Sequence, residues 1–164
     1  MNYLIFTIEA FALVVAFSLI IMIPLCKNPV WWIHDYPKDI QDVYFETHER
    51  IPTEPFSKTV LRKKSLAILF ALVLMVALVW LCGARTFSAG FLTSYALWLI
   101  IDWYDCFFLD WVLFANLKRI RLPGTENMDK AYHQKKFHVV RSFVGMVIGL
   151  IPCLLTGVIV MVIR

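Results

Sequence analysis

The chain has 164 residues, of which 60% are hydrophobic and 17% charged, and its mean hydropathy is +0.71. These values lie outside the range of a soluble globular domain and indicate a small polytopic membrane protein. The net charge of +4 comes from basic loops, so it reflects topology and contact with anionic lipid, and we expect no nucleic-acid partner.

Four stretches are apolar enough to cross a membrane, at residues 3–26, 65–83, 87–117 and 137–163. A hydrocarbon layer of roughly 30 Å requires about 20 helical residues. An open sheet would leave backbone groups unsatisfied in lipid. The sequence therefore predicts an all-α fold, a four-helix transmembrane bundle that forms one domain over residues 1–164.

The distribution of basic residues predicts the orientation. Lysine and arginine concentrate in two loops, residues 27–64 and 118–136, whereas Arg85 is the single basic residue between the second and third spans. The positive-inside rule then puts both loops in the cytoplasm and both termini outside.

Before the third span, two features are notable. Glu9 in the first span is either an acid that reaches interfacial water or a member of a proton or cation relay. In the first loop, Pro37 suits the first turn of a short helix that runs to about His48. Because Ile40 and Tyr44 share one face of it, we expect an amphipathic helix on the inner membrane surface.

The third span carries Asp102, Asp105 and Asp110. A carboxylate inside a spanning helix costs a few kcal/mol or more unless it faces protein or water, so the three indicate a functional site. On an α-helical wheel Asp105 falls near −60° and Asp110 near +80° from Asp102, at about 100° per residue. Trp98 and Asn116 lie close to the same line, and aromatic residues fill the opposite side. The acidic stripe is thus predicted to face inward.

The second loop and the fourth span supply basic and imidazole groups. Glu126, His133 and His138 follow a Pro-Gly turn, and Arg141 begins the last span. Counting turns from the cytoplasmic boundary puts Arg141 level with Asp110, which predicts an ion pair between them. Gly145 and Gly149 form a G-x-x-x-G pattern that favours close packing.

Several of these motifs together carry a resemblance: Asp102-Trp103-Tyr104-Asp105, Asp110-Trp111, Pro123-Gly124-Thr125-Glu126, and Tyr36-Pro37-Lys38-Asp39 in the first loop. With these motifs the chain resembles a family of small uncharacterised bacterial four-span integral membrane proteins. The resemblance implies a bacterial inner-membrane, multi-pass setting and no particular activity.

Three functions stay open from the residues alone. The first is a site that binds a divalent metal, such as Mg²⁺, or a lipid or phosphate head group, because carboxylates are hard oxygen ligands. The second is a proton-coupled transporter of a small cation, and the third is an accessory or assembly subunit without a site of its own. A homodimer would be needed to enclose a transport pathway, and membrane lipid is the expected partner.

For the first function each candidate residue has a role. Asp102 and Asp105 would hold the metal. An enzyme of this kind would be a metal-assisted transferase or hydrolase acting on a membrane lipid. The Asp-x-x-Asp pair lacks the further residues of the CDP-alcohol phosphotransferase pattern, which weighs against an enzyme. The candidate catalytic residues are Asp102, Asp105, His133 and His138, and the candidate ligand-binding residues are Trp98, Asp110, Asn116, Glu126 and Arg141.

Overall fold

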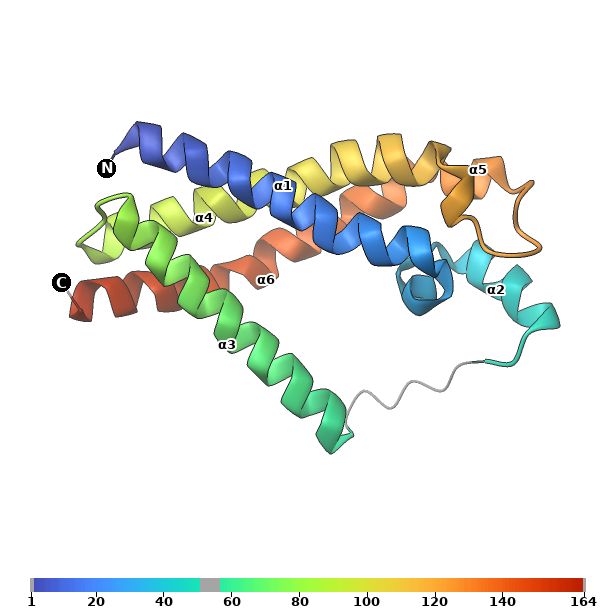
Figure 1. Cartoon of the computed structure of the whole chain (residues 1–164), viewed down its shortest axis with the longest axis horizontal. Helices are drawn as coiled ribbons and strands as arrows, with labels where there is room; N and C mark the ends of the chain where they lie inside the picture. Colours follow the sequence, from blue (N-terminus) through green and yellow to red (C-terminus); the bar gives the residue numbers. More distant parts are fainter. Residues whose placement is uncertain (1, 51–56, 164) are drawn as a thin grey trace. The chain divides into compact units, whose positions relative to one another are not determined.

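In a computed structural model of the chain, residues 2–50 and 57–163 are described, and this part of the chain contains helices and no strand (Figure 1). The all-α prediction is confirmed. The α-helices are α1 Tyr3–Lys27, α2 Lys38–Thr47, α3 Lys58–Leu81, α4 Phe87–Tyr104, α5 Asp129–Tyr132 and α6 Lys135–Val162. Two 3₁₀ segments, η1 Pro29–Asp35 and η3 Lys118–Ile120, lie between them, and a π-helix, η2 Asp105–Phe114, continues α4.

Three segments of the described chain are long and apolar enough to cross a membrane, namely Tyr3–Lys27, Val60–Leu81 and Asp129–Val162. Their mean hydropathies are 2.6, 2.5 and 2.5. These lengths exceed the roughly 20 residues that a bilayer requires. The finding is consistent with a membrane protein.

Local sequence explains where several helices begin. Ser57 accepts a hydrogen bond from the backbone N–H of Val60 at 3.3 Å and so caps α3. Asn28 accepts one from Val30 at 3.1 Å and begins η1 in the same way. Pro37 directly precedes α2, which agrees closely with the short helix predicted from Pro37 to about His48.

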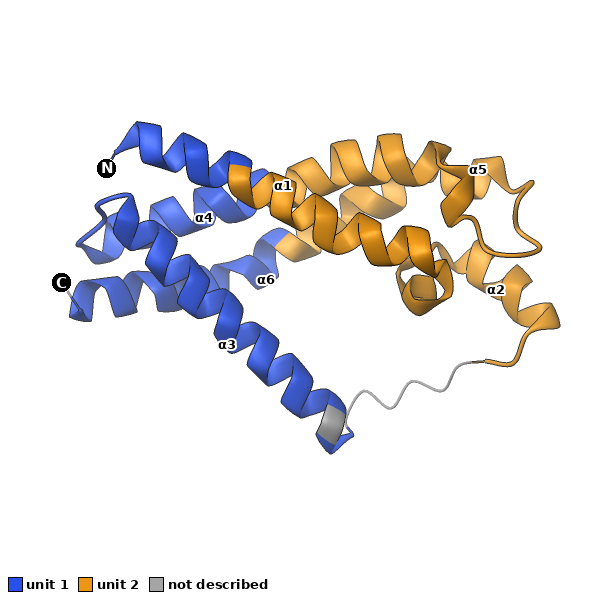
Figure 2. Ribbon diagram, viewed as in Figure 1, with its two compact units in different colours: residues 1–11, 51–100, 146–164 blue, residues 12–50, 101–145 orange. Residues whose placement is uncertain are grey.

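The chain divides into two compact units (Figure 2). Unit 1 comprises residues 1–11, 51–100 and 146–164, and unit 2 comprises residues 12–50 and 101–145. Helices α1, α4 and α6 contribute residues to both. The single domain predicted from the sequence stays a prediction.

Unit 1 is packed through small residues. A Cβ atom added at Gly90 in α4 would lie 3.1 Å from Cα of Gly157 in α6, so the two backbones approach closely there. Val79, Ala84 and Val160 form its buried apolar cluster. Glu9 is also buried, and the Cys82 thiol donates to its Oε2 at 2.8 Å.

Unit 2 has the larger buried core, and residues of both predicted cytoplasmic loops form much of it. The ring of Tyr36 lies 4.9 Å from that of Phe114 and 6.2 Å from that of Tyr132, measured between centroids. The Tyr36 hydroxyl donates to the carbonyl of Ile120 at 2.6 Å. Gln134 donates to Oδ2 of Asp39 at 2.8 Å and so ties the chain after α5 to α2. The two loops are therefore folded against each other.

Candidate functional site

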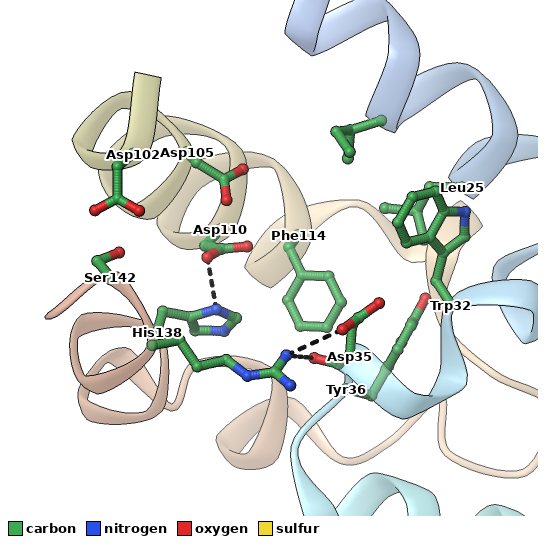
Figure 3. Close-up of a pocket in the computed structure, with 12 residues that line it drawn as sticks. Leu25, Trp32, Asp35, Tyr36, Asp102, Asp105, Asp110, Phe114, His138 and Ser142 are labelled. Atoms are coloured by element: carbon green, nitrogen blue, oxygen red, sulfur yellow. Dashed lines mark hydrogen bonds and ion pairs between the residues drawn. The ribbon is translucent and has the colours of Figure 1, made fainter. Parts of the chain in front are cut away.

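A cavity of about 270 Å³ lies wholly within unit 2 (Figure 3). Figure 3 shows Asp102, Asp105 and Asp110 on one side of the view and Leu25 and Trp32 on the other. The cavity is thus acidic on one wall and apolar on another. Its lining residues are Ile21, Leu25, Trp32, Asp35, Tyr36, Asp102, Asp105, Asp110, Phe114, His138, Arg141 and Ser142.

The π-helix η2 explains why Asp105 and Asp110 share this cavity. In η2 the backbone N–H of Ala115 donates to the carbonyl of Asp110, five residues earlier. This i→i+5 pattern makes each turn wider than an α-helical turn, so residues five apart come onto one face. On an α-helix the same residues would be separated by about 140°. The α-helical wheel was wrong from Asp105 onward, and the two carboxylates face the same cavity.

Asp110 is paired with a histidine of α6. Its Oδ2 lies 2.7 Å from Nδ1 of His138. The His138 residue is 5% exposed and lines the cavity, and its other ring nitrogen, Nε2, is buried without a hydrogen-bond partner in the described part of the chain. A buried ring nitrogen without a partner is rare enough to need an explanation.

The predicted Asp110–Arg141 ion pair is wrong. Arg141 Nη1 donates to the backbone carbonyl of Asp35 at 2.9 Å and lies 3.4 Å from its Oδ1. The prediction counted depth along straight α-helices, and it treated the first loop as lying apart from the helix ends. Asp35 ends η1, which is folded against α6, so it reaches the guanidinium while His138 takes Asp110.

Asp102 lies in the last turn of α4, before the π-helix begins. Its Oδ2 is buried and has no hydrogen-bond partner among the residues described. Its Oδ1 packs against Gly145, where an added Cβ would overlap it. In unit 1, Gly149 packs in the same way against the ring of Trp98. The close packing predicted for the G-x-x-x-G pattern is therefore present, and it accommodates side chains of α4.

Tyr36 also lines the cavity. Its side chain is buried, and this burial, with a smaller contribution from neighbouring Tyr132, raises the pKa of the phenol well above its ordinary value. The hydroxyl therefore stays protonated and available to donate to Ile120. This bond fixes the loop after η2 to the end of η1.

The structure brings together five of the predicted site residues and leaves four elsewhere. Five line the cavity: Asp102, Asp105, Asp110, His138 and Arg141. His133, Asn116 and Glu126 are exposed and do not line it. The Nδ1 of His133 lies 2.7 Å from the Asp129 carbonyl, and Asn116 donates to Val112 at 2.8 Å. Trp98 belongs to unit 1.

Sequence reasoning missed the contribution of the first loop. Asp35 and Trp32 line the cavity, as does Ser142 of α6. The available signal was the adjacency of Asp35 to Tyr36-Pro37, a pair that carried the family resemblance. Ser142 lies four residues after His138, so the two share one face of α6.

Among the residues described, no group of three or more His, Cys, Asp or Glu side chains is arranged to hold a metal ion. Of the four aspartates that line the cavity, Asp102 and Asp105, one helical turn apart, form no ion pair with a basic side chain of the described chain. Their role as metal ligands stays a prediction. No protein-family model, no curated protein and no solved structure matches the chain.

Proposed function

We propose that this protein binds a divalent cation, Mg²⁺ or Mn²⁺, in an acidic site within the membrane that opens toward the cytoplasm. The observation that carries the proposal is the charge imbalance of the cavity in unit 2. Four aspartates line it against one arginine and one histidine. Carboxylate oxygens are the ligands that these hard cations prefer.

The ion pairs identify which carboxylates are available. Asp110 is engaged by His138 and Asp35 by Arg141. Asp102 and Asp105 are left on the acidic wall, and Oδ2 of Asp102 is buried with no partner in the described chain. Two negative charges one helical turn apart repel each other unless they are compensated, and one divalent cation balances both.

Mg²⁺ fits this pair better than a cation that demands a complete protein cage. It commonly retains several waters and is held by one or two carboxylates together with oxygens of a substrate. A site of two carboxylates in a cavity of about 270 Å³ leaves room for such waters. An enzyme built on it would be a metal-assisted transferase or hydrolase acting on a membrane lipid.

The membrane arrangement that goes with this proposal has four spans. Residues 87–114, α4 followed by η2, form the third span, and both termini are extracytoplasmic. Helix α2 lies at the inner surface, and its apolar face, with Ile40 and Tyr44, packs into the buried core of unit 2. The setting is a bacterial inner membrane.

A proton-coupled cation transporter is the second candidate, and the observation that favours it is Glu9. This glutamate is 7% exposed, and its Oε1 has no hydrogen-bond partner among the described residues. A second buried acid is what a proton relay requires. An accessory subunit without a site is less well supported, because it gives no reason for a cavity beside Asp102.

Binding of Mn²⁺ to the purified protein in detergent, followed by electron paramagnetic resonance, tests the proposal. The wild type should bind about one Mn²⁺, and Asp102→Asn and Asp105→Asn should each weaken binding tenfold or more, since each removes a charged ligand. Asp42→Asn, on the exposed face of α2, is the matched control and should bind as the wild type does. Equal affinities in all four proteins would refute the site. Proton release on addition of a cation to proteoliposomes, abolished by Glu9→Gln, would instead favour transport.

A further inference from the structure

We infer that the cavity of unit 2 takes a phosphate group as the second ligand of the bound cation, and that Arg141 receives this phosphate in exchange for Asp35. The inference rests on the proposed function and adds to it the chemical class of the substrate.

Helix α6 supplies hydrogen-bond donors to the cavity. Arg141 and His138 both line the cavity, three residues apart and so on neighbouring turns of one face. Arginine presents five N–H donors in a planar fork that matches phosphate. Both contacts of Arg141 with Asp35 use Nη1, so Asp35 engages one edge of the fork.

The buried nitrogen of His138 is the second, independent observation. The residue is 5% exposed, and Asp110 lies 2.7 Å from its Nδ1. The other ring nitrogen, Nε2, is buried and has no hydrogen-bond partner in the described chain. A phosphate monoester carries both acceptor oxygens and an O–H donor, so it would supply a partner for Nε2 whichever ring nitrogen holds the proton.

Asp35 has the features of a group that a ligand can displace. Its Oδ1 lies 3.4 Å from Nη1 of Arg141, which is longer than a good charge-assisted bond. The side chains of Arg141 and Asp35 are 49% and 60% exposed, so this pair contributes little to stability. A phosphate would gain a bidentate contact with Arg141 and a contact with the cation, neither of which Asp35 makes.

The apolar wall favours a lipid as the source of the phosphate. Ile21 and Leu25 of α1 and Trp32 of η1 line the cavity. Figure 3 shows Leu25 and Trp32 on the other side of the view from Asp102 and Asp105. Inorganic phosphate has no apolar group to bury against such a surface, whereas a lipid phosphate can place its first chain carbons there. The cation then bridges Asp102, Asp105 and the head group, the arrangement in which Mg²⁺ is commonly bound.

The test measures how much phosphate strengthens Mn²⁺ binding. The gain is the ratio of the Mn²⁺ Kd without phosphate to that with phosphate. It is measured with inorganic phosphate in phosphatidylcholine nanodiscs, and separately in nanodiscs that contain phosphatidic acid, with empty nanodiscs subtracted. We expect a gain of about tenfold with phosphatidic acid, the effect of one or two charge-assisted hydrogen bonds.

Variants assign the gain to the cavity. Arg141→Gln should remove it, Asp35→Asn should increase it by removing the carboxylate charge that competes with the phosphate for Arg141, and the exposed control Lys136→Gln should keep it. A gain confined to phosphatidic acid identifies a lipid source, and an equal gain with inorganic phosphate identifies free phosphate. If Mn²⁺ binds without any gain, or if the gain is unchanged in Arg141→Gln and Asp35→Asn, the inference is overturned while the proposed function stands. Absence of Mn²⁺ binding in phosphatidylcholine nanodiscs would overturn the proposed function and the inference with it.

Discussion

His138 Nδ1 and Asp110 Oδ2, 2.7 Å apart, join α6 to the π-helix η2. The histidine is buried, and the side chain of Asp110 is 26% exposed. By contrast, Arg141 and Asp35 are both half exposed. The stability of unit 2 should therefore depend on the histidine more than on the arginine.

Replacing His138 should destabilise the protein more than replacing Arg141. His138→Ala leaves the Asp110 carboxylate poorly solvated and without a partner, a loss of roughly 1–3 kcal/mol in the free energy of unfolding. Arg141→Ala removes an exposed pair, which costs less than about 1 kcal/mol. Thermal unfolding of both variants in the same detergent compares them, and an equal or larger loss for Arg141→Ala would contradict the pairing.

Removing the Tyr36 hydroxyl should loosen the contact between η1 and the loop after η2. Tyr36→Phe leaves the buried Ile120 carbonyl without its donor, and we expect a loss of about 1–3 kcal/mol. Tyr3→Phe, at a side chain that is 73% exposed, is the control and should unfold as the wild type does. Unfolding temperatures that are identical for the two variants would mean that the bond contributes nothing.

The buried Tyr36 side chain should make the folded protein less stable at alkaline pH. Burial raises the pKa of Tyr36 in the folded protein, so above the unfolded-state value of about 10 the unfolded chain releases a proton that the folded chain retains. Stability from this group is therefore complete below pH about 10 and declines as the pH rises further. The decline between pH 9 and pH 11 should be smaller in Tyr36→Phe than in the wild type. Parallel declines would show that other groups cause it.

Gly145 should be required for the position of Asp102. An alanine Cβ at residue 145 would overlap Oδ1 of Asp102, so the carboxylate must turn away. Alanine is favoured over glycine in a helix by roughly 0.5–1 kcal/mol, and the helix itself should not suffer. We expect Gly145→Ala to weaken Mn²⁺ binding about tenfold while the protein stays folded. The exposed neighbour Val144→Ala is the control, and equal Mn²⁺ affinities would show that Asp102 tolerates the methyl group.

Much of the helical fold could be predicted from the sequence, because apolar length and capping act locally. The spans predicted at residues 3–26 and 137–163 closely match α1 and α6, which the structure has at Tyr3–Lys27 and Lys135–Val162. Helix α3 begins at Lys58, seven residues before the predicted start, because Ser57 caps it and its basic first turns are helical too. Hydropathy alone cannot detect such a polar beginning.

The site could be predicted only in part, because two of its determinants are not local. Asp102, Asp105 and Asp110 stand out as charges in an apolar segment, and His138 and Arg141 were found with them. The π-helical turn between Asp105 and Asp110 has no compositional signature, so the wheel gave the wrong angle. Asp35 lies far from Arg141 in sequence, and only the folding of the first loop onto α6 brings them together.

In the proposed function, the aspartates of α4 and η2 face a cavity that holds water and opens to the cytoplasm. Asp105→Cys, made in a protein whose four native cysteines are replaced by serine, can be probed with a membrane-impermeant thiol reagent in inside-out and right-side-out vesicles. Phe107→Cys, at a ring that is 48% exposed on the aromatic side, is the control and should not react from either side. We expect Asp105→Cys to react only in inside-out vesicles, where the reagent meets the cytoplasmic face. Failure to react in both preparations, or reaction in right-side-out vesicles alone, would contradict it.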